Sequence, residues 1–101
     1  MLFSLFKNFA LQAERAKNTP GARIIDVRTE EEYAAGHLPQ AENIPLDRLS
    51  GARFNEGEKL FVYCYSGVRS GRAAAYLKKA GADAVDMGGI AGYKGEIVGG
   101  R

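Results

Sequence analysis

Apolar residues recur along the chain in short runs that switch between helical and extended spacing. In the N-terminal segment, residues 1–18, the apolar positions lie on one helical face and end before the turn signal of residues 18–21. They are Leu2, Leu5, Phe6, Phe9 and Ala13. The spacing predicts an amphipathic helix over residues 3–17 whose apolar face packs on the core; contact with a membrane surface or a second copy is the alternative.

Four short extended runs follow, and helical segments separate them. The runs are residues 23–27, 41–44, 59–64 and 84–87. The third is almost continuously apolar, which is typical of a strand buried on both faces of a sheet, so we expect it to be central. Between the runs, helices are expected over residues 29–36, opened by a Thr29/Glu32 capping box, and over residues 70–79, with one further helical turn at 46–49. After residue 88 we expect only a short helical turn.

Alternation of strands and helices predicts the fold class. We expect an α/β domain with a mostly parallel central sheet of about four to five strands, flanked by helices on both faces. A length of 101 residues with 46% apolar content fits one domain over residues 1–101, and the glycine-rich residues 99–101 are expected to form a mobile tail.

Charge and cysteine content exclude several function classes. The 14 basic and 12 acidic side chains are scattered, which argues against nucleic-acid binding. The N-terminal apolar stretch is interrupted by Lys7, has no basic segment before it and is not followed by an apolar run of 18 residues, so we expect neither a signal peptide nor a membrane span. A single cysteine excludes an intramolecular disulfide, a CxxC pair and a cysteine-based zinc site. We therefore expect a cytoplasmic protein that needs no metal and no organic cofactor.

Residues 64–70 (CYSGVRS) carry the candidate chemistry, because they join the most apolar strand to the helix that follows it. Ligands of open α/β sheets bind at the carboxyl ends of strands. Gly67 and Ser66 permit a tight loop whose N–H groups converge on an anion at the helix N-terminus. Together with Arg69, these groups favour the thiolate of Cys64, which is the nucleophilic form. A buried, inert cysteine is the alternative.

Six short motifs occur in one order along the chain: residues 25–28 (IDVR), 31–33 (EEY), 36–38 (GHL), 41–45 (AENIP), 64–70 and 88–90 (GGI). In this order they resemble a single-domain rhodanese, a member of the sulfurtransferase family, over about residues 22–98. The resemblance implies a ping-pong reaction. Cys64 would take a sulfane sulfur from thiosulfate or a persulfide donor, and would pass it to cyanide or a thiol. The sequence departs from the family after the GG pair, where Tyr93 stands near the position of a usual tryptophan.

The resemblance also assigns roles to individual residues. The substrate-binding loop would consist of Tyr65, Ser66, Gly67, Val68, Arg69 and Ser70, with Asp26 and Arg28 as supporting residues below it. Arg69 and the loop N–H groups would hold the anionic donor and the persulfide. Ser70 would either cap the helix or bond the sulfur, and Arg72 would be a solvated arginine or add positive potential at the entrance. We expect His37 to bond backbone groups of its turn rather than to act with Cys64.

The distance from the cysteine to the arginine separates related activities. Four residues lie between Cys64 and Arg69, whereas related phosphatases and arsenate reductases resemble a C-x5-R loop with a wider cradle. The shorter loop favours sulfur over phosphate. Two other hypotheses about the function remain open: the protein could pass a persulfide sulfur to a partner protein, or it could be a binding module whose fold serves protein contact.

Overall fold

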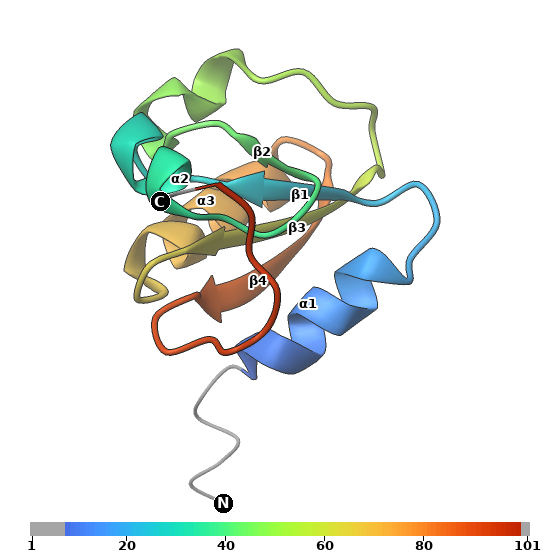
Figure 1. Cartoon of the computed structure of the whole chain (residues 1–101). Helices are drawn as coiled ribbons and strands as arrows, with labels where there is room; N and C mark the ends of the chain where they lie inside the picture. Colours follow the sequence, from blue (N-terminus) through green and yellow to red (C-terminus); the bar gives the residue numbers. More distant parts are fainter. Residues whose placement is uncertain (1–7, 100–101) are drawn as a thin grey trace, which may run out of the picture.

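The computed structural model describes residues 8–99, and its centre is a parallel sheet. The four strands in this part of the chain are β1 (Arg23–Asp26), β2 (Ala41–Asn43), β3 (Lys59–Cys64) and β4 (Asp83–Gly89). They lie in the order β2-β1-β3-β4, and every neighbouring pair is parallel (Figure 1). The predicted fold class is confirmed, and β3 occupies the interior position that its apolar sequence indicates.

Alternate residues of β3 face two separate hydrophobic layers. Leu60, Val62 and Cys64 belong to the layer covered by α3 (Val68–Lys79) and the 3-10 helix η2 (Leu46–Gly51). Phe61 and Tyr63 belong to the opposite layer, which α1 (Phe9–Lys17) covers. Helices therefore cover both faces of the sheet, as predicted (Figure 1). Because side chains alternate along a strand, this register places the cysteine on the face that α3 covers.

Helix α1 is shorter than its sequence pattern indicates. The prediction of one continuous helix over residues 3–17 is wrong at Asn8, because Asn8 is extended and its side chain accepts the N–H of Leu11, so that α1 begins at Phe9. Phe9 packs edge to face on Tyr63 and on Tyr93, with ring centroids 5.5 and 5.1 Å apart. The predicted packing on the core is thus confirmed for α1. Leu2, Leu5 and Phe6 lie outside the described residues.

Two further boundaries differ from the sequence pattern, and both lie beside the candidate site. Helix α3 begins at Val68 rather than at residue 70, because Gly67 adopts the left-handed conformation before it. Strand β4 extends to Gly89, since a register shift at Val62/Tyr63 lets it pair with β3 as far as Cys64. The expected helical turn after residue 88 is instead a turn that the Tyr93 N–H closes onto the Ile90 carbonyl.

The remaining helix, α2 (Glu30–Ala35), follows the carboxyl end of β1. Its capping box is present as predicted: Thr29 and Glu32 each accept the other's backbone N–H. Between residues 8 and 99, no helix is long and apolar enough to cross a membrane. Residues 100 and 101 of the expected tail lie outside the described part.

Candidate active site

Cys64 is the last residue of β3, and its side chain is fully buried at the foot of the loop that leads into α3. Its sulfur accepts the N–H of Gly67 at 3.0 Å and the N–H of Ser70 at 3.3 Å. Both donors belong to the start of α3, where backbone N–H groups lack partners within the helix. The predicted nest of N–H groups therefore converges on this sulfur, and a negative charge on it would be stabilised.

Gly67 determines the shape of this nest. Its φ of 104° lies in the left-handed region, and it occupies the N-cap position of α3. A side chain at this position would add backbone strain. The conformation turns the Gly67 N–H back toward the Cys64 sulfur, which explains why a short loop suffices to surround the atom.

Ser70 lies within the first turn of α3, so the alternative that it caps the helix is wrong. Its hydroxyl lies 2.8 Å from Asp86 Oδ1 in β4 and 3.5 Å from the Cys64 sulfur. The same carboxylate oxygen accepts the Gly88 N–H at 2.9 Å. Asp86 thus ties the start of α3 to β4 behind the sulfur. Sequence reasoning missed this residue, because it is one polar position in a short strand.

Gly89 lies directly against the loop, and this contact was also missed. Two backbone hydrogen bonds join the residues after Gly89 to the loop: the Ile90 N–H donates to the Cys64 carbonyl, and the Ala91 N–H donates to the Tyr65 carbonyl. A Cβ atom on Gly89 would lie 2.7 Å from the Cα of Ser66 and would also collide with the Tyr65 carbonyl oxygen. Only glycine allows β4 to approach this closely, which gives the GGI motif a physical reason.

Arg69 is turned toward Glu32 of α2 rather than bonded to the sulfur. Its two terminal nitrogens lie 2.7 and 3.0 Å from the two carboxylate oxygens of Glu32. Hydrogen bonds from Arg69, aided by the Thr29 N–H and opposed by partial burial, lower the pKa of Glu32 to about 2. Glu32 is therefore ionised at any ordinary pH. The hydrogen bonds to the sulfur come from backbone N–H groups, whereas Arg69 interacts with Cys64 through its charge while its guanidinium is paired with Glu32.

Asp26 and Arg28 form a buried ion pair at the end of β1. The Arg28 Nη2 lies 2.6 Å from Asp26 Oδ2 and also donates to the Gly36 carbonyl at 2.7 Å. Burial alone would lower the pKa of Arg28, but the hydrogen bonds and charge of Asp26 outweigh it and raise that pKa. The guanidinium also lies over the Tyr63 ring at 5.6 Å. The pair fixes the segment that leads from β1 to Thr29 and so to Glu32.

The remaining loop residues form an exposed rim. Tyr65 and Val68 are 54% and 69% exposed, and Ser66 is also exposed. His37 lies in its own turn, where its Nδ1 is 2.8 Å from the Tyr33 carbonyl and its ring stacks on Tyr33, so the prediction that it bonds backbone groups is confirmed. Hence the exposed rim next to the sulfur, formed by Tyr65, Ser66 and Val68, carries no charged side chain.

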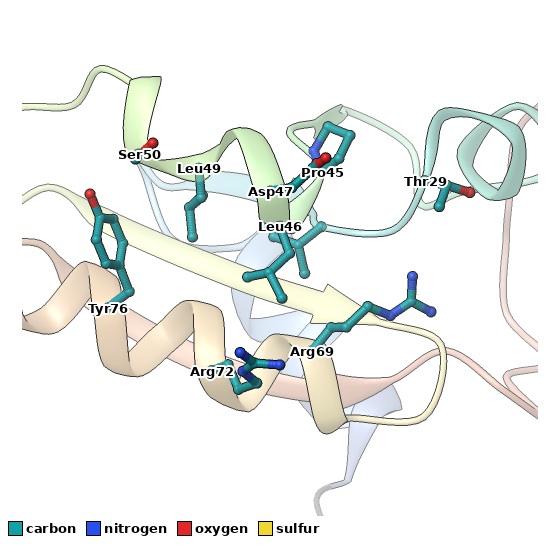
Figure 2. A pocket seen from close by; sticks show the side chains of 10 residues that line it. Thr29, Pro45, Leu46, Asp47, Leu49, Ser50, Arg69, Arg72 and Tyr76 are labelled. Atoms are coloured by element: carbon teal, nitrogen blue, oxygen red, sulfur yellow. The ribbon is translucent and has the colours of Figure 1, made fainter.

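A pocket of about 600 Å³ lies between η2 and α3, and Arg69 lies on its wall. Figure 2 shows Leu46 and Leu49 of η2 on one side and Arg69, Arg72 and Tyr76 of α3 on the other. The volume is in the range of small-molecule sites. Within residues 8–99, no group of three or more His, Cys, Asp or Glu side chains could hold a metal ion.

The structure is a parallel α/β domain with a cysteine loop at the carboxyl end of the interior strand β3. Comparisons with known proteins identify its family. The Rhodanese-like domain family matches residues 10–96. The chain belongs to this family. A solved rhodanese-like domain protein from Staphylococcus aureus is 35% identical, with a TM-score of 0.75 over 88% of this chain and 90% of that one. A rhodanese with anions from E. coli is 31% identical, with a TM-score of 0.69 over 78% of this chain and 99% of that one.

Two of three curated relatives have names that refer to sulfur transfer or sulfur carriage. A protein named Sulfurtransferase from Allochromatium vinosum is 36% identical over 68% of this chain and 66% of its own length. The putative sulfur carrier protein YrkF of Bacillus subtilis is 34% identical over 67% of this chain and 38% of its own length. The uncharacterized protein YqhL of the same organism is 46% identical over 59% and 49%. The chain thus spans about half or less of the two Bacillus relatives.

Proposed function

We propose that the protein is a sulfurtransferase in which Cys64 carries the sulfur as a persulfide. In the first half-reaction the Cys64 thiolate attacks the sulfane sulfur of a donor such as thiosulfate, the new S–S bond forms, and sulfite leaves with the electron pair of the broken bond. In the second, cyanide or a thiolate attacks the outer sulfur and the Cys64 thiolate is the leaving group. Transfer between sulfur atoms needs no general base, so the absence of a histidine beside Cys64 is no objection.

The observation that carries this proposal is the pair of N–H groups on the Cys64 sulfur, at 3.0 and 3.3 Å. They stabilise negative charge on the Cys64 sulfur before it attacks the donor and again when it leaves in the second half-reaction, because backbone dipoles that are already oriented need no rearrangement. Tyr65, Ser66, Gly67, Val68, Arg69 and Ser70 would form the binding loop, with Asp26 and Arg28 holding it from below. The acceptor would be cyanide, a small thiol or the thiol of a partner protein in the cytoplasm.

Sulfur loading is the direct test. Incubation of the reduced protein with thiosulfate or an alkyl hydropersulfide is expected to add the mass of one sulfur atom, and cyanide is expected to remove it, because Cys64 forms a labile persulfide. Intact mass spectrometry measures both steps. The Cys64→Ser variant is the control and should gain nothing. A wild-type protein that gains no sulfur from either donor would rule out the proposed function.

Hydrolysis of an aryl phosphate tests the alternative that the protein is a phosphatase. Hydrolysis of an aryl phosphate is expected to be no faster with the wild-type protein than with Cys64→Ser, because the short Cys64 to Arg69 loop directs only two N–H groups onto its sulfur and Arg69 is held by Glu32. Release of the chromogenic phenol over hours measures it. Hydrolysis that depends on Cys64 would place the chain with the phosphatases.

A further inference from the structure

The ion pair between Glu32 and Arg69 changes the charge that a donor meets at the site. Arg69 is the one cationic side chain of residues 64–70. Both of its terminal nitrogens bind Glu32. Because the two side chains are about one-third exposed, the pair lies at the protein surface beside the cysteine loop, which we call the mouth of the site. Because the pKa of Glu32 is lowered to about 2, the carboxylate keeps its charge wherever the enzyme would work.

A second arginine near the site, Arg28, is also paired with a carboxylate. Arg28 is buried against Asp26 with an N···O distance of 2.6 Å. Arg72 lies one turn further along α3 and faces the pocket, which Asp47 also lines. At the back of the site, Asp86 adds a carboxylate 2.8 Å from the Ser70 hydroxyl. The loop therefore offers a donor two backbone N–H groups but no free guanidinium.

We propose that Glu32 is a specificity-determining residue, which holds Arg69 in an ion pair and so selects an organic persulfide of low charge over the doubly charged thiosulfate ion. The inference rests on the sulfur transfer proposed above and names its donor class. A carboxylate at the mouth repels an approaching dianion about twice as strongly as a monoanion, and a neutral molecule not at all. A free Arg69 would attract the same ions in the same proportion.

The surroundings of the loop also suit an organic donor. The rim residues Tyr65 and Val68 are exposed and largely apolar. The adjoining pocket, bounded by Arg69, presents the side chains of Leu46 and Tyr76 (Figure 2). Thiosulfate has no organic group to bury against these surfaces, whereas the R group of a persulfide does.

The chemistry balances for such a donor. The Cys64 thiolate attacks the outer sulfur of R–S–SH, a new S–S bond forms at Cys64, and the S–S bond of the donor breaks, so that RS⁻ leaves with its electron pair. One negative charge is present before and after the step, the proton stays on the transferred sulfur, and no external oxidant or reductant is needed. Neither reactant is multiply charged, which suits a loop whose one cationic side chain, Arg69, is paired with a carboxylate.

The experiment compares two donors in a set of variants. We would measure kcat/KM for thiosulfate and for benzyl hydropersulfide, which has no other charged group; in a ping-pong reaction this ratio reports the donor half-reaction alone. Glu32→Gln is expected to raise kcat/KM for thiosulfate about fivefold, the effect of one unit charge on a dianion at a partly exposed site, and to change the value for the persulfide less than about twofold. Glutamine can still complete the capping box with Thr29, so α2 is retained.

Two further variants separate charge from structure. Arg69→Gln leaves Glu32 uncompensated and is expected to lower thiosulfate use more than persulfide use, and the Glu32→Gln/Arg69→Gln double variant should return the ratio of the two donors to near its wild-type value. Glu30→Gln is the matched control: Glu30 also belongs to α2 but pairs with the exposed Arg48, so neither donor should be affected.

The outcomes distinguish this inference from the proposed function. If the wild-type protein transfers sulfur but Glu32→Gln changes both donors equally, or lowers both, Glu32 has a structural role and the inference is wrong. If neither donor loads the wild-type protein, the proposed function itself is wrong.

Discussion

Gly89→Ala is expected to slow sulfur loading of Cys64 by about 10²-fold, the cost of moving reacting groups by about 1 Å. The added Cβ would lie 2.7 Å from the backbone of Ser66 and would collide with the Tyr65 carbonyl oxygen. Neither contact can be relieved by rotating a side chain, because both involve backbone atoms. The loop must move away from β4, and the Gly67 N–H that now lies 3.0 Å from the Cys64 sulfur moves with it.

Stopped-flow or quenched mass measurements of persulfide formation would give this rate, and circular dichroism would show whether the variant is folded. Overpacking costs about 1–3 kcal/mol, so we expect a folded protein with a lower melting temperature. Gly51→Ala is the control, since a Cβ at Gly51 meets nothing within 4 Å and its φ is not positive. A Gly89→Ala protein that loads sulfur at the wild-type rate would show that the contact with β4 does not position the loop.

The fold was largely predictable because its signals are local. The apolar run of β3, the Thr29/Glu32 capping box and the alternation of strands with helices each depend on residues close in the sequence. The predictions were wrong at the ends of helices, where the conformation of one residue determines where the helix begins. Asn8 begins α1 later than its apolar spacing indicates, and Gly67 begins α3 earlier.

The candidate site was predictable only in part, because its partners are distant in the sequence. The position of Cys64 at a strand end and the N–H groups of its loop follow from residues 64–70. The pairing of Arg69 with Glu32 joins residues 37 positions apart, and the contact of Ser70 with Asp86 joins residues 16 apart. No local pattern specifies such pairs. As a result the sequence indicated that the charge of Arg69 would favour the thiolate, but not that the fold also pairs Arg69 with the carboxylate of Glu32.

Arg28→Met is expected to lower the free energy of unfolding by about 3–5 kcal/mol, because it leaves the Asp26 carboxylate buried without its partner. The Asp26 side chain has no exposed surface, and three of its contacts at 2.6–3.0 Å come from the Arg28 side chain. Arg28 also holds the Gly36 carbonyl, so the turn after α2 loses a donor as well. Urea unfolding followed by circular dichroism would measure the change, since the sequence has no tryptophan for fluorescence.

The loss of stability in Arg28→Met is expected because the ion pair is buried, not because an ion pair is removed. Arg48→Met removes an ion pair of similar length, 2.8 Å to Glu30, but both side chains there are more than 60% exposed, and little change in the urea midpoint is expected. The Asp26→Asn/Arg28→Met double variant removes the stranded charge and should recover part of the loss even if Arg28→Met alone does not fold. Equal effects of Arg28→Met and Arg48→Met, or a double variant less stable than Arg28→Met, would mean that the uncompensated carboxylate of Asp26 is not the cause.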